Sequence, residues 1–309
     1  MKRYGNLYEK ICDKDNLRLA HQNARKGKTH YREVVMVDGD VEFYIDAIHE
    51  MLVNETYSIS EYGVFTKIDK GKEREIFVLP YYPDRIVQWA IVQILEPIWM
   101  PTFIDNTYSS LKGRGIHYGL KKLKKDLKNE VETKYCLKLD VRKFYPSVDH
   151  AILKRIIRRK IKDNKLLSLL DNIIDSAKGV PIGNYLSQYF GNLYLSRFDH
   201  WMNETNGVKY YHRYCDDIVI LHKSKGALHE LFEKISVYLN ENLKLTVKYN
   251  YQIFPTNVRG IDFLGYRFFG THILLRKRIV KSFKHKMLKL LSFSELTERD
   301  LNVIASYAG

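Results

Sequence analysis

The spacing of apolar positions changes several times along the chain, and each change predicts a different element. Residues 1–60 are expected to be mostly helical, because their clearest apolar stripe recurs three and four positions apart. This stripe consists of Val41, Tyr44, Ile45, Ile48 and Leu52. Two β-prone segments, 62–67 and 74–79, then flank a polar turn that contains Gly71, which predicts a β-hairpin.

Further helices are expected from Pro83-Asp84, over residues 117–129 and from Ala151. The last two carry apolar residues on one side and Lys or Arg around the rest of their surface. One such helix is usually a solvated surface of the protein. Two in one basic chain favour contact with phosphate groups.

Two carboxylate positions stand at the ends of predicted strands. Residues 135–141 alternate as a half-buried strand, which places Asp140 at its end. Residues 208–221 form two apolar segments around Cys215-Asp216-Asp217, the pattern of a hairpin with carboxylates at its turn. A divalent cation relieves the repulsion between neighbouring carboxylates, and ligands that are all oxygen suit Mg²⁺.

Composition narrows the class of partner. The chain has 309 residues and a net charge of +15, from 51 Lys plus Arg against 36 Asp plus Glu. This excess favours a polyanion such as nucleic acid over a basic protein with no such role. No run of about 18 apolar residues and no apolar signal core are present, so neither a membrane span nor secretion is expected. Three scattered cysteines predict reduced thiols in the cytoplasm.

Three motifs occur in an order that resembles reverse transcriptases. Asp140 is followed five residues later by an aromatic residue, then come a Tyr-x-Asp-Asp sequence at 214–217 and Phe-Leu-Gly-Tyr at 263–266. The resemblance runs from about Lys67 to Phe268 and implies an α+β right-hand polymerase with fingers, a palm of antiparallel sheet plus helices, and a small helical thumb.

The implied organisation has four parts. They are an N-terminal helical extension (1–60), fingers (61–134), a palm (135–260, with an inserted helical fingers segment at 151–180), and a primer-grip hairpin with a short thumb (261–309). The primer grip is formed by Phe263, Leu264, Gly265 and Tyr266.

The resemblance implies an RNA-directed DNA polymerase that works by two-metal nucleotidyl transfer. Two Mg²⁺ ions, for which Mn²⁺ can substitute, would be held by the carboxylates of Asp140, Asp216 and Asp217 and the backbone carbonyl of Val141. Lys248 resembles the catalytic lysine that protonates pyrophosphate, and a plain surface lysine is the equal alternative.

Residues in two other regions would contact the incoming nucleotide. Tyr145 occupies the position of the aromatic gate that excludes a ribose 2′-hydroxyl, which predicts DNA as the product; an ordinary core aromatic is the alternative. Lys67 and Arg74 match the residues that bind the triphosphate. Lys70 and Lys72 are close alternatives to Lys67.

The segment 180–188 points to one branch of the family. Most relatives have Gln-Gly-x-x-x-Ser-Pro here, whereas this chain has Ile182 and Gln188 at the two outer positions, around Gly183 and Ser187. The variant resembles reverse transcriptases of diversity-generating retroelements, which copy a template-repeat RNA with frequent errors at adenines. Our hypothesis is that Gln hydrogen-bonds near the nucleotide sugar and that Ile182, which cannot, loosens selection; simple packing of Ile182 is the alternative.

Partners follow from the same resemblance. They are template RNA, the cDNA/RNA duplex, dNTP, a basic accessory variability protein that forms a pentameric barrel, and the structured retroelement RNA, in the cytoplasm of a bacterial or phage-encoded system and without a membrane. A retron or abortive-infection reverse transcriptase is the nearest rival. A non-catalytic RNA-binding scaffold is another, although the three intact aspartates argue against it.

Overall fold

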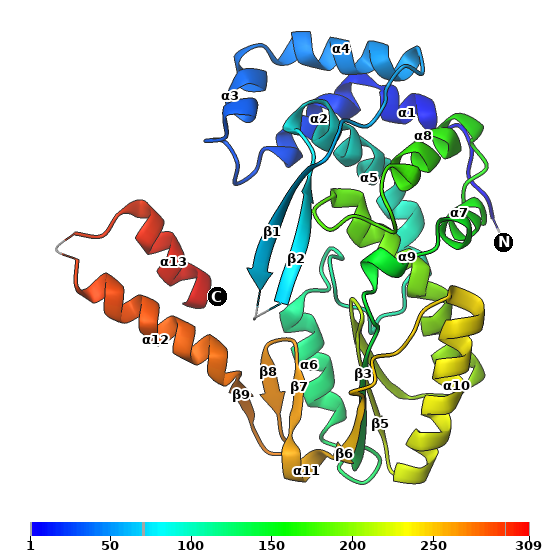
Figure 1. The fold of residues 1–309 in the computed structure, drawn as a ribbon, viewed down its shortest axis with the longest axis vertical. Coiled ribbons are helices and arrows are strands. Elements are labelled where there is room, and N and C mark those ends of the chain that lie inside the picture. The colour runs from blue at the N-terminus through cyan, green and yellow to red at the C-terminus, as the bar shows by residue number, and fades with distance from the viewer. Residues whose placement is uncertain (1, 70–71, 294, 309) are drawn as a thin grey trace.

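The N-terminal part of the protein is helical, as predicted. The computed structural model describes residues 2–69, 72–293 and 295–308. The first four helices are α1 (Tyr8–Cys12), α2 (Lys14–Ala24), α3 (Arg32–Gly39) and α4 (Val41–Val53). Helix α4 buries Ile45, Ile48 and Leu52, so the predicted apolar stripe is confirmed. These helices form one end of the molecule (Figure 1).

A two-stranded hairpin follows, as the alternating pattern predicted. Strands β1 (Gly63–Asp69) and β2 (Lys72–Val78) pair antiparallel, and residues 70–71 of the predicted turn lie outside the described residues. Apolar side chains of β1 are at least half exposed, namely Val64, Phe65 and Ile68. A two-stranded hairpin is only marginally stable by itself. Its base is tied to the rest of the protein by a 2.9 Å hydrogen bond from the Phe77 amide to the Ile182 carbonyl.

Helices lead from the hairpin to the second half of the molecule. The helix expected from Pro83 starts with a short turn, η1 (Tyr81–Arg85), before α5 (Ile86–Trp99) and η2 (Met100–Thr102). The predicted basic helix near residue 117 is α6 (Ile116–Asp126).

The palm is a four-stranded antiparallel sheet in the order β4-β5-β3-β6. Its strands are β3 (Tyr135–Asp140), β4 (Tyr210–Tyr214), β5 (Asp217–His222) and β6 (Gln252–Pro255). The elements between β3 and β6 that accompany it are η3 (Tyr145–Ser147), α7 (His150–Arg158), α8 (Asn164–Asp175), α9 (Tyr185–His200), η4 (Trp201–Thr205) and α10 (Lys225–Leu243).

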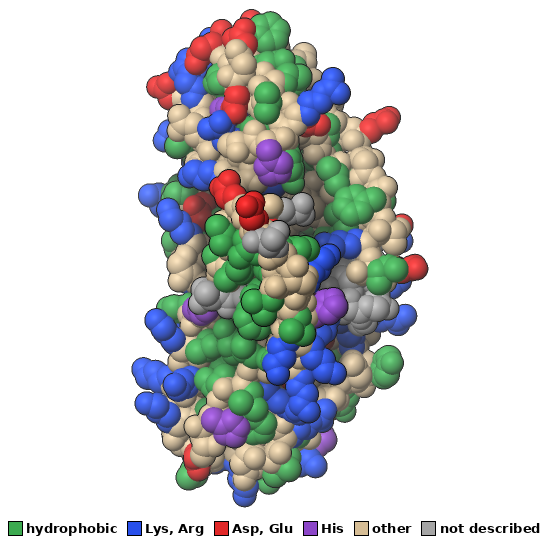
Figure 2. Space-filling model, turned by 90° about the vertical axis from the view of Figure 1, so that its left-hand side faces the viewer, with side chains coloured by type: hydrophobic (Ala, Val, Ile, Leu, Met, Phe, Trp, Pro, Cys, Tyr) green, Lys and Arg blue, Asp and Glu red, His purple; other side chains and the backbone are tan. Residues whose placement is uncertain are grey.

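The C-terminal part begins with α11 (Thr256–Arg259) and a small sheet, followed by two helices. The sheet has the order β7-β8-β9, and its strands are β7 (Ile261–Phe263), β8 (Tyr266–Phe268) and β9 (Ile273–Leu275). Helices α12 (Lys277–Leu291) and α13 (Glu298–Ala308) extend to one side of the molecule (Figure 1). Figure 2, which views this side, shows hydrophobic side chains through its middle and Lys and Arg gathered mainly in its lower half.

Both faces of the palm sheet are buried, which explains its strong apolar character. Leu137 and Leu139 pack into the large core that continues through α5 and α9 to the N-terminal helices. Cys136 and Val219 face a second core that contains Phe263 from the C-terminal sheet. The α+β class is thus confirmed. In the described ranges, no helix is long and apolar enough to cross a membrane.

Candidate active site

Antiparallel pairing brings the predicted carboxylates together. Asp140, the last residue of β3, is directly opposite Asp217, the first residue of β5. Asp216 stands immediately before β5, in the turn that joins β4 to β5. The turn is tighter than the predicted Cys-Asp-Asp turn, because Asp217 already pairs with its neighbours in the sheet.

The backbone of this turn is unusual at Cys215. Its φ angle is +57°, in the left-handed region that non-glycine residues rarely adopt. The Cys215 thiol donates a 3.3 Å hydrogen bond to the Tyr145 hydroxyl, and burial raises the thiol pKa to about 12. Cys215 therefore acts as a protonated, space-filling residue of the turn, and its thiol is not a nucleophile at neutral pH.

Asp216 and Asp217 bind a proton more tightly than ordinary carboxylates do. Burial, and then the neighbouring charge of Asp140, raise the pKa of Asp216 to about 7. Burial also raises the pKa of Asp217, although Lys138 opposes the shift. Like charges in a poorly solvated site resist ionisation together, so the turn favours either a proton or a cation between these groups.

Two lysines supply part of that positive charge. Lys138 Nζ lies 2.6 Å from Asp217 Oδ1, and Lys248 Nζ lies 2.6 Å from Asp140 Oδ1. The Lys248 amide also donates to the Asp140 carbonyl at 2.8 Å, which fixes the lysine beside the end of β3. The sequence expectation placed Lys248 near this site, whereas Lys138 was not singled out.

The donor set fits a hard divalent cation. Asp140 Oδ1 is buried without a hydrogen bond of good geometry, and Asp216 shares its surroundings. Carboxylate oxygens are the ligands that Mg²⁺ prefers. Within the described part of the chain, no group of three or more His, Cys, Asp or Glu side chains is arranged to hold a metal. Asp140 and Asp216 share their surroundings most closely, and a bound cation would take the place of the lysine ammonium groups that lie 2.6 Å from Asp140 and from Asp217.

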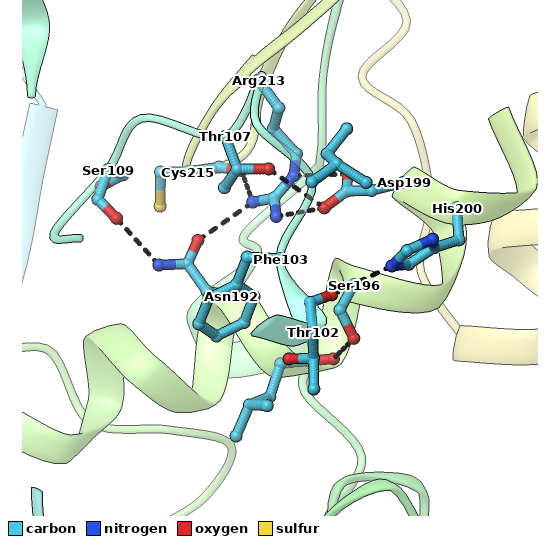
Figure 3. A network of polar contacts seen from close by, with 12 residues as sticks. Thr102, Phe103, Thr107, Ser109, Asn192, Ser196, Asp199, His200, Arg213 and Cys215 are labelled. Atoms are coloured by element: carbon cyan, nitrogen blue, oxygen red, sulfur yellow. Dashed lines mark hydrogen bonds and ion pairs between the residues drawn. The ribbon is translucent and has the colours of Figure 1, made fainter. Parts of the chain in front are cut away.

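A buried ion pair between Arg213 of β4 and Asp199 of α9 supports the carboxylate turn (Figure 3). Arg213 and Asp199 are both fully buried, and the guanidinium makes two hydrogen bonds of 2.7 and 2.6 Å to the carboxylate. Arg213 also donates to the Cys215 carbonyl at 2.9 Å and to the Asn192 side chain at 3.2 Å. Because Asp199 and Asn192 belong to α9, this pair fixes the carboxylate turn against that helix.

The residue expected to exclude the 2′-hydroxyl lies beside the turn. Tyr145 is half-buried, and burial raises its pKa well above the usual range. Gly191 of α9 makes room for its ring, since a Cβ there would come within 3.2 Å of Tyr145. Tyr145 therefore stands next to Cys215, as a residue that shapes a nucleotide pocket would.

The 180–188 segment forms the loop before α9 and the first turn of that helix, which begins at Tyr185. Gly183 has a φ of +127°, and a Cβ there would lie 1.9 Å from the Phe77 carbonyl oxygen of β2. Ile182 is half-buried and Gln188 is exposed. Ser187 is buried, and its hydroxyl donates to the Pro181 carbonyl at 2.7 Å. Ser187 thus stabilises the loop from inside, and its contact with a nucleotide stays a prediction.

The two basic residues predicted to bind the triphosphate are paired in the fingers hairpin. Lys67 of β1 is directly opposite Arg74 of β2 in the backbone register, and Lys67 is exposed. The side chain of Arg74, together with the alternatives Lys70 and Lys72, lies outside what the structure describes. The structure therefore brings Lys67 and Arg74 to one place on the hairpin, and their contact with a nucleotide stays a prediction.

The predicted primer grip is the turn between β7 and β8. Leu264 and Gly265 have φ angles of +54° and +88°, the backbone of a two-residue hairpin turn that matches the twist of its strands. Phe263 is fully buried, and Lys138 Nζ lies 5.5 Å from the centre of its ring. Lys138 therefore links the palm carboxylates to this hairpin. Tyr266 is half-buried on β8.

Three residues that contact or support the carboxylate turn were not predicted from the sequence: Lys138, Asp199 and Arg213. Lys138 shares a strand face with Asp140, two positions away, so alternation could have identified it. Arg213 immediately precedes the Tyr-x-Asp-Asp sequence and lies on an apolar strand, where a charged residue signals a buried partner. Asp199 gives no such signal, because it is one polar residue in a mixed helix.

Comparisons with known proteins agree with this geometry. The profile of the family described as Reverse transcriptase (RNA-dependent DNA polymerase) matches residues 65–268. The chain is 26% identical over 274 residues to Protein YkfC of Escherichia coli (strain K12), covering 74% of this chain and 70% of that protein. It is 25% identical over 208 residues to the group II intron-encoded protein LtrA of Lactococcus lactis subsp. cremoris, covering 62% of this chain and 34% of that protein.

The fold has relatives among solved structures. Apo telomerase from Candida tropicalis superposes with a TM-score of 0.55 at 13% identity, over 71% of this chain and 49% of that one. The likeness concerns the fold alone. The chain spans about a third of the intron-encoded protein and about half of the telomerase.

Proposed function

Because this chain belongs to the reverse transcriptase family, we propose that it synthesises DNA on an RNA template with the carboxylate turn of the palm as its catalytic site. The observation that carries the proposal is the meeting of Asp140 with Asp216, where burial, and then the charge of Asp140, raise the pKa of Asp216 to about 7. A site that disfavours its own negative charge is suited to hold cations where phosphates react.

Each part of the site has a role in this proposal. Asp140 and Asp216 would hold divalent cations, with Asp217 and the Val141 carbonyl completing the set. When bound, the ions would activate the primer 3′-hydroxyl and steady the leaving pyrophosphate. Lys248, which lies 2.6 Å from Asp140, would deliver a proton to pyrophosphate as a general acid.

Nucleotide selection falls to the surrounding loops. Tyr145 beside Cys215 would exclude a 2′-hydroxyl, so that dNTPs are the substrates. Lys67 and Arg74 would neutralise the triphosphate, since two basic residues opposite each other on a hairpin are stabilised by an anion between them. The turn of Leu264 and Gly265 would position the primer strand.

We further propose that the chain works in a diversity-generating retroelement, copying a template-repeat RNA with errors at adenines. The support is the sequence Ile182-Gly183-x-x-x-Ser187-Gln188 and the place of its loop against β2. The partners would be the structured retroelement RNA and a basic accessory variability protein. A retron or abortive-infection enzyme is the second candidate, and no contact in the described residues favours it.

Primer extension tests the polymerase proposal. Wild type should extend a DNA primer on RNA with dNTP and Mg²⁺, and Asp216→Asn should lose roughly a thousandfold or more of the rate, because two-metal catalysis supplies several kcal/mol. Asn keeps the shape of Asp, and a thermal melt checks that the variant folds. Equal extension by both proteins would contradict the metal assignment.

Sequencing of cDNA tests the retroelement proposal separately. Wild type should misincorporate mainly at template adenines, and Ile182→Gln should reduce those errors. Gln188→Pro, the other difference from the common motif, serves as the comparison. Uniform fidelity of the wild type would remove the retroelement proposal and leave the polymerase proposal intact.

A further inference from the structure

The face around α7 carries a cluster of arginines that the proposed catalytic site does not use. Arg155 of α7 and Arg159, the residue that caps its C-terminus, are exposed and lie about one helical turn apart. Together with the exposed Arg197 of α9, they line a hollow of about 640 Å³. A second, more open hollow of about 630 Å³ lies against the same two residues and is also lined by Arg3.

The carboxylates near this arginine face already have partners. The pairs are Lys154–Asp175, Arg158–Asp171, Lys244–Asp149 and His200–Glu204. By contrast, Arg155, Arg159 and Arg197 make no ion pair with a carboxylate in the part of the chain that the structure describes. The face therefore keeps uncompensated positive charge, which a polyanion would neutralise.

The N-terminal segment is fixed so that it adds to this charge. The Tyr4 amide donates to the Lys160 carbonyl at 2.7 Å, and the Lys162 amide donates to the Tyr4 carbonyl at 2.8 Å. Arg3 donates to the Ile161 carbonyl at 3.2 Å. These bonds hold Arg3 beside the end of α7, so the surface is assembled from three separate stretches of chain.

The chemistry of the face suits RNA with unpaired bases. Guanidinium groups bind phosphates through two hydrogen bonds, which the ammonium group of lysine cannot match. Trp201 and Tyr238, whose rings stack at 4.3 Å, line the same hollow as Arg197. Aromatic rings and arginine planes accept splayed bases of single-stranded RNA loops.

The arginine face lies away from the elements proposed to contact the nucleotide and the primer. Helix α7 lies on the side of the molecule opposite to α12 and the β1–β2 hairpin (Figure 1). The proposed triphosphate contacts and primer contacts are on the β1–β2 and β7–β8 hairpins. We therefore expect phosphates bound at α7 to belong to a segment other than the base-paired template and primer.

We propose that this arginine face binds the backbone of a looped RNA segment outside the copied template. The choice of RNA as the polyanion rests on the proposed function, whereas the charge of the face does not. The surface would hold the enzyme on its own RNA while the copied strand moves through the catalytic site.

The proposal is tested by measuring the affinity for a stem–loop RNA while the catalytic site is occupied. The 309-residue protein is first saturated with an unlabelled RNA–DNA primer–template, and a fluorescent stem–loop RNA is then titrated. Arg155→Gln/Arg159→Gln should weaken stem–loop binding about tenfold and make the salt dependence shallower by about 1.4, since each single-strand phosphate contact contributes about 0.7. Gln keeps a helix propensity close to that of Arg and removes the charge.

The control removes equal charge elsewhere. Lys209→Gln/Lys225→Gln changes two exposed lysines near the ends of β4 and β5 farthest from the carboxylate turn, and should shift stem–loop binding less than about twofold. Both double variants should extend a short primer–template at the wild-type rate. Equal weakening by both variants, or loss of extension only in the arginine variant, would overturn the proposal.

Two further outcomes are informative. Displacement of the stem–loop by polyglutamate as readily as by unlabelled stem–loop RNA would indicate an acidic protein partner and overturn the RNA assignment. If wild type failed to extend any primer while the arginine variant alone lost stem–loop binding, the proposed function would fail and the binding surface would stand.

Discussion

The carboxylate turn of the palm and the β1–β2 hairpin of the fingers are both antiparallel hairpins, yet the protein supports them very differently. The palm hairpin is buried on both faces and held by the Arg213–Asp199 pair. The fingers hairpin exposes Val64 and Ile68 by 54% and 72%, and the Phe77 amide ties its base to a loop.

The difference indicates a division of labour. The palm hairpin is positioned by the folded chain before any substrate arrives, which suits groups that must meet a reacting phosphate within tenths of an ångström. The fingers hairpin has few contacts of its own and can take up additional contacts from a bound nucleotide. We therefore expect palm changes to alter stability strongly and fingers changes to alter substrate binding.

The largest effect is expected from breaking the buried ion pair. Arg213→Met leaves Asp199 charged, buried and unpaired, which should lower the free energy of unfolding by about 3–5 kcal/mol in urea denaturation. Asp199→Leu in the same chain should restore part of the stability but not the extension rate, because the bond to the Cys215 carbonyl is still missing. Full recovery of both would show that Arg213 has no positioning role.

A pH dependence should follow from Asp216. Its pKa is raised to about 7, so between the ordinary carboxyl value and that pH the folded chain keeps a proton that the unfolded chain has lost. Its contribution makes stability fall as pH rises through this window and stay level above it. Without metal, Asp216→Asn should therefore gain stability over wild type by a few kcal/mol between about pH 4 and pH 7, since each pKa unit is worth about 1.4 kcal/mol. A pH-independent difference would contradict the assignment.

A side chain at Gly183 should disturb the contact between the fingers hairpin and the loop before α9. A Cβ there would clash with the Phe77 carbonyl at 1.9 Å, and the φ of +127° disfavours alanine, so Gly183→Ala should cost about 1–3 kcal/mol of strain. The strain should separate the hairpin from the loop and raise KM for dNTP more than it lowers kcat. Gly63→Ala is the matched control, because its nearest neighbour, the Val78 carbonyl, would be 3.7 Å away.

The smallest effect on the fold is expected at Lys67. Lys67→Ala should raise KM for dNTP about tenfold, equivalent to about 1.4 kcal/mol, through loss of one charge from the triphosphate. Its exposure predicts a change in unfolding free energy within about 0.5 kcal/mol. Thr66→Ala on the same strand should leave both quantities unchanged. A large loss of stability in Lys67→Ala would remove the contrast between the two hairpins.

The sequence was most informative where periodicity and chemistry coincide. Alternation in 135–141 predicted Asp140 at a strand end, and the two apolar segments of 208–221 predicted Asp216 and Asp217 at a hairpin turn; the register of β3 with β5 places Asp140 opposite Asp217. The contact of Gly183 with Phe77 was not predictable, because it joins segments about a hundred residues apart and involves backbone atoms alone. Asp199 was likewise not predictable as the partner of Arg213, because no pattern distinguishes it from the other polar residues of α9.

The two lysines beside the carboxylates affect how a nucleic acid approaches the palm. Lys138 and Lys248 lie within 2.6 Å of Asp217 and Asp140, so most of the negative charge at the turn is balanced inside the protein. Under the proposed function, an incoming primer strand would therefore meet little repulsion there, even though its phosphates would pass close to three acids. On a chain of net charge +15, this internal balance would allow the strand to bind before any ion does.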